Sequence, residues 1–384
     1  MKLAFIFDVA FAKYNDQYYS VNLSQKFWKD RYLPYFDEIV VIGREKTVTE
    51  DPTGKMVRSD SNKVHFCCMP NGNRINRMFS LNKENKFIEE AIADCDFVVC
   101  RSWWGVSVCE KLNKKYMIEV ITCAWDGMWN HSRIGRFLAV PYYLNQRKAI
   151  KKAPYALYVT EEFLQGRYPC KGVSVGVSDV MLKNISDDTV LEKRLERIDA
   201  SSEKILLGTA AAVNVKYKGQ RFVIEALHIL KSKGYDCFRY QLAGGGDNSD
   251  LKKLVDKYDL NDVVEFLGSV PQDKIHDWYE SLDMYVQPSL QEGLPRSVVE
   301  AMSHAIPCVC MKTGGMPELV EPEYICTKRG NKAKTIANKL LLMKNKENMK
   351  KAAQYNFARS KNYYPEVLDT RRKDFMKRFI NQEK

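Results

Sequence analysis

Two glutamates in the second half of the chain could hold a polyhydroxylated ligand. Glu292 stands in the run Q-P-S-L-Q-E-G-L-P-R, and Glu300 follows eight residues later, about two helical turns on. An ionised carboxylate only accepts hydrogen bonds, so each glutamate can bind neighbouring hydroxyl groups of a sugar. The amides of Gly293 and Leu294 precede a helix that should open at Pro295, and such amides suit an anion or a hydroxyl. The alternative is that the two glutamates are a helix-start charge and a solvated helix residue.

Three basic residues of the second half gain a role only from a family resemblance, which would place them at an anionic leaving group. Lys218 lies in the motif Y-K-G, Lys216 precedes it by two residues, and Arg296 follows the proline. A fixed cation placed where negative charge develops stabilises the transition state more than the ground state. Taken alone, Lys218 fits a solvated loop lysine better than a binding residue.

Aromatic and acidic side chains in the first half suit a sugar ring. The run E-V-I-T-C-A-W-D-G-M-W-N-H follows an apolar segment and contains Trp125, Asp126 and His131. Asp126 could orient or deprotonate an acceptor hydroxyl, with His131 as its rival. Tyr18 lies in 8–19, which we expect to be a loop at the carboxyl end of the first strand, where it could contact the acceptor. Buried tryptophans with a capping aspartate, and an ordinary loop, are the structural alternatives.

Short apolar runs alternate with amphipathic stretches along most of the chain, which is typical of a parallel sheet covered by helices. Strands are predicted in the first half at Lys2–Phe7, Glu38–Gly43, Lys63–Met69, Asp96–Arg101, Tyr116–Ile121 and Ala156–Thr160. They are predicted in the second half at Lys204–Ala211, Tyr240–Ala243, Val263–Leu267, Asp283–Gln287 and Pro307–Met311. This pattern indicates two α/β domains that face each other, with ligands outside the carboxyl ends of the strands.

The composition places the chain among globular proteins. It has 384 residues, of which 45% are hydrophobic and 28% charged. No apolar stretch approaches the roughly 18 residues of a membrane helix, and the amino terminus carries no signal-peptide pattern. The eleven cysteines are expected to be free thiols of a cytoplasmic protein. The acidic pair Asp94 and Asp96 precedes a strand, the wrong end for a ligand, so no metal site is predicted.

Positive charge is concentrated in one part of the chain. The net charge is +12, and residues 101–183 hold 13 Lys and Arg against 6 Asp and Glu. This excess suggests either an anionic partner, such as a membrane face, or a solubilising surface. The basic residues form no recognised nucleic-acid-binding motif, so no nucleic acid partner is predicted.

The glutamate pair, followed by Pro307 and by G-G-M-P-E at 314–318, resembles the E-x7-E signature of retaining glycosyltransferases of family four, which have the GT-B fold. Three further motifs fall in the family's order: the glycine turn at 244–247, the loop at 266–271 and Y-K-G at 217–219. One departure matters, because the arginine that the family usually has about six residues before this lysine is replaced near Ala212.

The resemblance implies a role for each motif. Glu292 would bind the donor sugar, Glu300 the ribose, and Lys218 the diphosphate leaving group. Further donor contacts would come from Gly293, Leu294, Arg296, Lys216 and Val270. The domains would comprise an acceptor-binding unit at 1–178, a donor-binding unit at 179–358 and a helix at 359–384 that returns to the first unit.

The implied reaction transfers a sugar from a UDP- or GDP-linked donor to a hydroxyl group of a glycan or lipid-linked glycan, with retention and without a metal or other cofactor. Capsule, O-antigen or exopolysaccharide synthesis would be the setting, at the inner face of the cell membrane. The alternatives are a catalytically silent sugar- or nucleotide-binding partner in a biosynthetic complex, and a nucleotide-sugar epimerase of the same fold.

Overall fold

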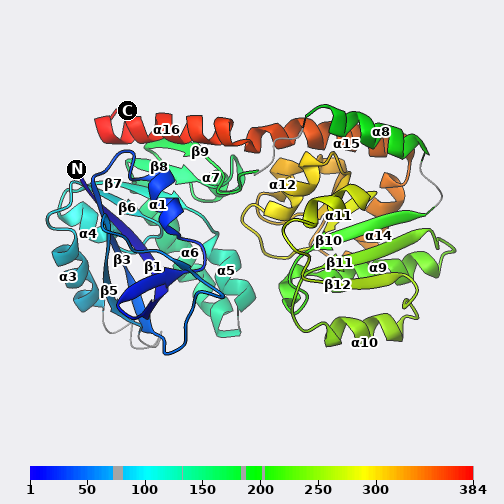
Figure 1. Ribbon diagram of the computed structural model, residues 1–384, viewed down its shortest axis with the longest axis horizontal. Helices are drawn as coiled ribbons and strands as arrows, with labels where there is room; N and C mark the ends of the chain where they lie inside the picture. The colour runs from blue at the N-terminus through cyan, green and yellow to red at the C-terminus, as the bar shows by residue number, and fades with distance from the viewer. Residues whose placement is uncertain (72–80, 132, 183–186, 201–203, 384) are drawn as a thin grey trace.

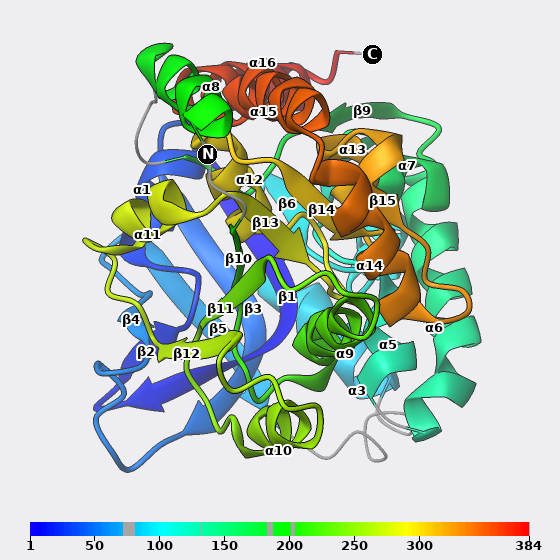
Figure 2. The ribbon, with the colours of Figure 1, turned by 90° about the vertical axis from the view of Figure 1, so that its right-hand side faces the viewer.

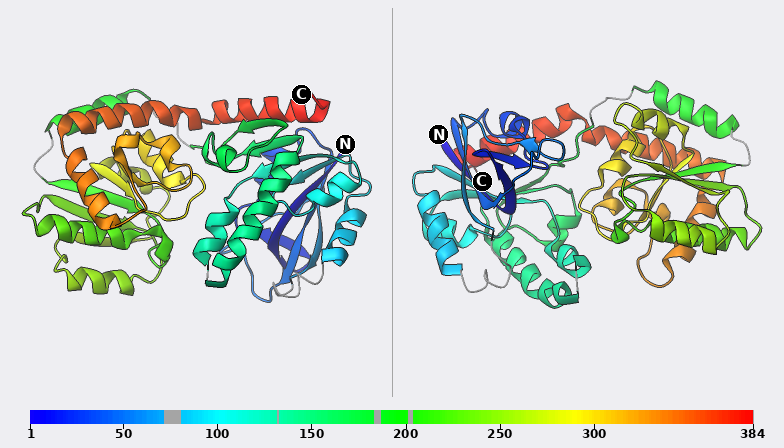
Figure 3. Two further views of the ribbon diagram at one scale, coloured as in Figure 1. Left: turned by 180° about the vertical axis from the view of Figure 1, so that it is seen from behind. Right: turned by 60° about the horizontal axis from the view of Figure 1, so that its bottom comes forward.

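The computed structural model describes residues 1–71, 81–131, 133–182, 187–200 and 204–383, which form two α/β units side by side (Figure 1). Each unit is built around its own sheet with its own buried core. Figure 3 shows the same two units from behind and from below, with the carboxyl-terminal helices running along one side of them.

The first unit has a nine-stranded sheet. Its strands are β1 (Lys2–Tyr14), β2 (Gln17–Ser20), β3 (Glu38–Thr47), β4 (Val57–Arg58), β5 (Val64–Pro70), β6 (Phe97–Cys100), β7 (Lys115–Val120), β8 (Tyr155–Tyr158) and β9 (Val173–Gly176). The helices are α1 (Gln25–Arg31), α3 (Leu81–Ala91), α4 (Val106–Lys111), α5 (Ala124–His131), α6 (Arg133–Lys152) and α7 (Phe163–Arg167). β1 lies between β3 and β6 and is parallel to both.

The second unit has a six-stranded parallel sheet in the order β12-β11-β10-β13-β14-β15. Its strands are β10 (Ile205–Ala210), β11 (Phe238–Ala243), β12 (Val264–Gly268), β13 (Met284–Gln287), β14 (Cys308–Met311) and β15 (Ile325–Cys326). Its helices are α8 (Thr189–Ala200), α9 (Gln220–Lys231), α10 (Ser249–Lys257), α11 (Ile275–Ser281), α12 (Arg296–Ser303), α13 (Met316–Leu319), α14 (Lys332–Met343) and α15 (Lys346–Ser360), with 3₁₀ turns η1 (Lys216–Lys218), η2 (Pro322–Tyr324) and η3 (Lys361–Tyr363). Figure 2 shows this unit in front, with α9 and α14 next to each other.

The strand order reverses at β10 and β13, which are neighbours although they are far apart in the sequence. From β10 the chain moves outward to β11 and β12, whereas from β13 it moves the other way to β14 and β15. The segments that leave β10 and β13 therefore diverge at the carboxyl edge and leave a crevice between them.

The last helix, α16 (Pro365–Asn381), lies against the first unit although the chain reaches it from the second. Its Leu368, Phe375 and Phe379 are buried in the core under β1, β6 and α1. Phe379 packs edge-on against Phe97, with ring centroids 5.3 Å apart. The helix thus connects the two units through apolar burial.

Carboxylates also join the units. Glu318 of α13 accepts hydrogen bonds from the backbone N–H groups of Glu161 (2.7 Å) and Phe163 (2.5 Å), at the start of α7. Glu161 in turn pairs with Arg359 and Arg371, both at 2.7 Å. These contacts link the segments that follow the carboxyl ends of strands in the two sheets.

The expectation that 8–19 is a loop was wrong. β1 continues to Tyr14 through a register shift between Ile6 and Ala10, and then turns into the antiparallel β2. Asn15 and Asp16 at this turn have φ of 48° and 57°. Two consecutive residues with positive φ match the twist of a tight hairpin, which Asn and Asp tolerate well.

Among the helices of the described ranges, none combines the length and the hydropathy that a membrane span requires. The cysteines are all free, as expected, and most of them are buried.

Candidate active site

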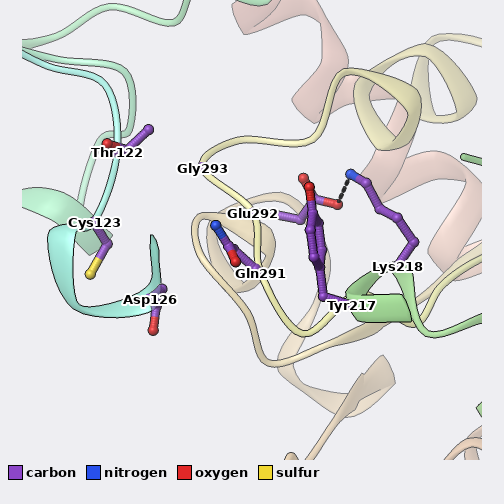
Figure 4. A pocket seen from close by; sticks show the side chains of 8 residues that line it. All are labelled: Thr122, Cys123, Asp126, Tyr217, Lys218, Gln291, Glu292 and Gly293. Atoms are coloured by element: carbon purple, nitrogen blue, oxygen red, sulfur yellow. Dashed lines mark hydrogen bonds and ion pairs between the residues drawn. The ribbon is translucent and has the colours of Figure 1, made fainter. Parts of the chain in front are cut away.

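Lys218 and Glu292 meet in the crevice at the carboxyl edge of the second sheet. Lys218 ends the 3₁₀ turn that follows β10, and Glu292 lies in the loop that follows β13. The Lys218 Nζ donates a hydrogen bond to the Glu292 Oε1 at 2.7 Å (Figure 4). The two side chains are 23% and 11% exposed, so the pair is partly shielded from water. Charge interactions are stronger in such a shielded environment than in bulk water.

A cavity lies between the two units at this pair. The second unit lines it with Tyr217, Lys218, Gln291, Glu292 and Gly293, and the first unit with Thr122, Cys123 and Asp126 (Figure 4). Gly293 lies so close to the first unit that an added Cβ would come within 3.2 Å of the Ile121 carbonyl oxygen. A group held by one unit can therefore reach a group held by the other.

Gln287 fixes the loop that carries Glu292. It ends β13, is 1% exposed, and accepts hydrogen bonds from Tyr285 Oη (2.9 Å) and Ser297 Oγ (3.2 Å). Its Nε2 donates to Ser289 Oγ at 2.7 Å and, at 3.4 Å, to Glu292 Oε1. A buried amide with all these partners holds the loop in one shape before any ligand arrives.

Two glycines are required where backbone segments meet around the pair. Gly219, directly after Lys218, has φ of 77°, and a Cβ there would lie 2.3 Å from the Pro288 carbonyl oxygen. Gly314 has φ of 55°, and a Cβ there would lie 2.3 Å from the Glu292 carbonyl oxygen. Any side chain at either position would clash with backbone, so both positions need glycine.

Glu300 and Val270 lie farther from the cavity. Glu300, on α12, accepts a hydrogen bond from Tyr279 Oη at 3.1 Å. Burial and the neighbouring Tyr285 and Glu300 raise the pKa of Tyr279, so its phenol remains a donor. Val270 is half-buried in the loop after β12, and the glycine turn lies beside that loop because the Gly244 N–H donates to the Gly268 carbonyl at 2.7 Å.

Near Ala212, where the family usually has an arginine, the side-chain amide of Gln220 contacts the backbone. Gln220 Nε2 donates to the carbonyl oxygens of Ala211 (3.4 Å) and Ala212 (3.1 Å). Lys216 does not fill the gap, because its side chain is 89% exposed, pairs with Asp250 and lines a neighbouring cavity. Arg296 is exposed at the start of α12.

A further cation, missed by the sequence reasoning, lies on the same carboxyl edge. Lys328 follows the two-residue strand β15 and donates from Nζ to the Leu290 carbonyl at 3.1 Å. Burial lowers the pKa of the Lys328 ammonium, while the charge of Asp126 across the units acts in the opposite direction. The signal in the sequence was the short apolar pair Ile325-Cys326 before T-K-R, which was not assigned to a strand.

The first unit contributes Asp126, from the first turn of α5. Its side chain is 13% exposed, and its Oδ2 lies 3.8 Å from the Arg167 guanidinium. Burial raises the pKa of the nearby Cys123 thiol. Asp126 is the acidic residue with which this unit lines the cavity.

Two tryptophans extend from Asp126 along α5. The rings of Trp125 and Trp129 are stacked with centroids 5.2 Å apart, and Trp125 also packs edge-on against Tyr143. Trp129 is 43% exposed. The side chain of His131, at the end of α5, lies outside the described residues.

Tyr18 is not brought to this site. It lies in β2, its Oη donates to Glu45 Oε2 at 2.6 Å, and its ring stacks on Phe66 with centroids 4.5 Å apart. The cause is the β1–β2 hairpin, which pairs this segment with the edge of the first sheet and leaves it outside the cavity.

Comparison with known proteins agrees with this geometry. The family described as "Glycosyl transferases group 1" matches residues 196–359, which include every strand of the second sheet. "Protein CapJ" of Staphylococcus aureus is 31% identical over 334 residues, or 85% of this chain and 82% of that protein. "Amylovoran biosynthesis glycosyltransferase AmsK" of Erwinia amylovora is 35% identical over 130 residues, 32% of this chain and 31% of that protein.

The fold also has a match among solved structures. Anabaena Alr3699/HepE, solved in complex with UDP, superposes with a TM-score of 0.64 at 14% identity, covering 98% of this chain and 100% of that one. At such low identity the likeness concerns the fold alone, and that fold is GT-B, the one expected from the sequence.

Proposed function

The chain belongs to the group 1 glycosyltransferases, and from this premise we propose that it transfers a hexosyl group from a UDP- or GDP-linked donor to a hydroxyl group of a glycan or lipid-linked glycan, with retention of configuration. The observation that carries the proposal is the cavity in which Lys218 and Glu292 of one unit face Asp126 of the other. We assign donor binding to the unit of β10–β15 and acceptor binding to the unit of β1–β9.

The donor side of the proposed reaction rests on groups that lie close together. Cleavage of the glycosyl–phosphate bond builds negative charge on the diphosphate, and Lys218 Nζ is the fixed cation nearest the donor loop. Glu292 would accept from donor-sugar hydroxyls, with the amides of Gly293 and Leu294 beside it. The ion pair with Glu292 orients the Lys218 ammonium in advance, so less reorganisation is needed when the donor binds.

We assign the second positive charge at the diphosphate to Lys328. Lys328 lies at the same carboxyl edge as Lys218 and is partly buried. Its Nζ donates to the carbonyl oxygen of Leu290, the residue before Gln291, which lines the cavity. Lys216 and Arg296 are exposed to solvent and would contribute less. Lysine presents a single point charge and not a planar fork, so this site would bind the diphosphate less rigidly than an arginine.

The ribose and the base would lie beyond the diphosphate. Glu300 retains acceptor capacity for ribose hydroxyls alongside its contact with Tyr279. The backbone around Val270 would contact the base edge, and backbone groups alone leave the choice between uracil and guanine open. A bound donor would therefore extend from Glu292 toward the 266–271 loop.

Asp126 would orient or deprotonate the acceptor hydroxyl. It faces the donor pair across the cavity, and it is the acidic residue with which the first unit lines that cavity. The stacked Trp125 and Trp129 offer an aromatic face next to it for a sugar ring. His131 and Tyr18 do not enter this proposal.

The acceptor class and the location follow from the relatives by analogy. One relative is named for amylovoran biosynthesis and others for colanic acid biosynthesis. We therefore place this enzyme in the assembly of a bacterial polysaccharide on a lipid-linked acceptor, at the cytoplasmic face of the membrane. We further propose that the reaction needs no metal, since lysines would carry the charge that a cation supplies in other transferases.

The test is turnover with a panel of UDP- and GDP-hexoses and lipid-linked glycan acceptors, with and without EDTA. The proposal expects nucleotide diphosphate release that requires an acceptor and persists in EDTA, and a product whose anomeric ¹H coupling matches that of the donor. A product with the anomeric configuration opposite to that of the donor would contradict the retaining mechanism. Nucleotide binding without turnover would favour a silent binding partner, and isomerisation of the donor alone would favour an epimerase.

A further inference from the structure

Helix α6 of the first unit is unlike the rest of the chain in its charge. It is 20 residues long and contains no Asp or Glu. Its basic residues are Arg133, Arg136, Arg147, Lys148, Lys151 and Lys152. Of the basic residues whose side chains are described, all are exposed. Lys152 lies 3.9 Å from Glu110 of α4, and the helix still carries an excess of positive charge. A surface with such an excess attracts an anionic partner.

The same helix exposes large apolar side chains. Phe137 is 83% exposed, Leu144 54% and Val140 48%. Positions three and four apart lie on one face of a helix, so these three residues and the exposed Pro141 form a single stripe. Isolated exposed apolar residues are common on proteins, but a contiguous stripe marks an interaction surface.

The lysines continue this stripe toward the end of the helix. Lys148 lies four residues after Leu144, and Lys151 seven, which are the spacings of the same face. Long basic side chains at the end of an apolar stripe can extend sideways to phosphate groups while the stripe enters an apolar layer.

An aromatic side chain from the neighbouring helix extends the surface. Trp129 of α5 is 43% exposed, and the Arg136 guanidinium lies 5.8 Å from its ring centroid. Tryptophan and arginine together are characteristic of the interface between water and lipid. The two helices pack against each other on the side of the first unit that faces the second (Figures 1 and 3).

We propose that this surface, formed by Phe137, Val140, Leu144, Lys148, Lys151 and Trp129, binds the interface of an anionic lipid bilayer. Charge complementarity favours a bilayer with anionic headgroups, because the surface combines an excess of basic residues with an apolar stripe that a soluble anion would not need. The inference rests on the proposed function for its purpose. Asp126 lies on α5 beside the surface, so an acceptor anchored in the bilayer would reach the cavity from this side.

The experiment is flotation of the full chain with vesicles of phosphatidylcholine alone or mixed with phosphatidylglycerol. The wild type should bind the mixed vesicles and bind the neutral ones much more weakly. Lys148→Gln/Lys151→Gln should reduce binding to the mixed vesicles at least tenfold, since each charge near the surface contributes about a five-fold factor. Phe137→Asn/Leu144→Asn should reduce binding to a similar extent at every lipid composition.

Matched controls separate this surface from general effects. Lys373→Gln/Lys377→Gln removes the same charge from the exposed side of α16, and Val21→Asn replaces an exposed valine (64%) elsewhere on the first unit. Both controls should bind vesicles like the wild type. Melting temperature and UDP or GDP binding, measured on every variant, report whether the fold is intact.

Equal loss in the α16 control would overturn the inference, because binding would then follow net charge and not this surface. Wild-type binding to neither vesicle would overturn it too, as would a dimer or a captured protein partner that Phe137→Asn/Leu144→Asn abolishes while vesicle binding stays unchanged. Vesicle binding by a chain that binds no nucleotide would support this inference while removing the proposed function.

Discussion

The two walls of the cavity are built in different ways. On the donor wall, Lys218 donates a hydrogen bond to Glu292 at 2.7 Å. The fully buried Gln287 holds the loop that follows β13 and carries Glu292. On the acceptor wall, Asp126 lies 3.8 Å from its basic neighbour and Trp129 is 43% exposed. The donor wall is therefore shaped before the ligand arrives, whereas the acceptor wall presents a carboxylate to the cavity and an exposed aromatic face beside it.

This difference suits a reaction with one fixed and one variable substrate. A nucleotide diphosphate has the same anionic part whatever sugar it carries, so a preorganised cation is effective for all donors. Acceptors differ in shape, and exposed aromatic faces adapt to them at little cost in side-chain entropy. Specificity for the acceptor would thus lie in the first unit, together with the α6 surface.

The largest effect is expected on the donor wall, from Lys218→Met. Loss of a cation at the developing diphosphate charge should lower kcat by about 100- to 1000-fold. Lys257→Met, an exposed lysine on α10, is the control and should change kcat less than about three-fold. Steady-state nucleotide release measures both. Similar rates for the two variants would show that the donor wall is not where charge develops.

Asp126→Asn tests the acceptor wall. The variant keeps the shape and loses the base, so kcat should fall by about 100-fold. Nucleotide affinity, measured by calorimetry, should stay within about two-fold of the wild type because the donor wall is intact. A variant that loses nucleotide binding together with rate would break the division of labour between the two walls.

Lys328→Met tests whether Lys328 supplies the second positive charge of the donor wall. Removal of a charge-assisted contact with the diphosphate should weaken UDP or GDP binding about ten-fold. Arg329→Met removes a neighbouring exposed charge and should change affinity less than about two-fold. If Arg329→Met has the larger effect, the second cation has been assigned to the wrong residue.

The smallest effect on rate is expected from substitution of His304, which lies in the second unit. This histidine should affect how the free energy of unfolding depends on pH. Burial, His276 and Arg194 lower the pKa of His304 to about 4, from an ordinary value near 6.5. The unfolded chain then binds a proton that the folded chain does not, so the stability is present above pH 6.5 and is lost as the pH falls toward 4.

The expected loss for the wild type is about 2 kcal/mol of unfolding free energy between pH 7 and pH 5. His304→Gln should lose this part of the pH dependence and keep wild-type kcat at pH 7, since His304 lies outside the cavity. Urea unfolding at the two pH values measures it. An unchanged slope in the variant would contradict the assignment to this histidine.

The parts of the site that the sequence predicted well are local. The expected strand Asp283–Gln287 and the helix expected to open at Pro295 correspond to β13 and α12, because a continuous apolar run and a proline at the helix start determine both. The loop between them carries Glu292, so its place at the carboxyl edge followed from the same pattern.

The parts that the sequence did not predict depend on contacts between distant segments. Two facing domains were expected, but which residues of the first unit line the cavity beside Asp126 depends on the packing of the units, which no local period encodes. Lys328 follows a strand of only two residues, too short for a periodic signal. Tyr18 was placed in a loop because the hairpin at Asn15-Asp16 extends a strand beyond its apolar core, and pairing with β3 stabilises that extension.

The most direct test of Lys218 as the cation that binds the nucleotide diphosphate is the melting temperature of the wild type and of Lys218→Met with UDP, GDP, ADP and TDP, each with and without EDTA. A diphosphate at 100 times its dissociation constant adds about 2.7 kcal/mol of stability. We predict a rise in melting temperature with one of UDP or GDP that EDTA leaves unchanged and that Lys218→Met largely removes. No shift with any nucleotide, or a shift of equal size in the variant, would contradict this role of Lys218.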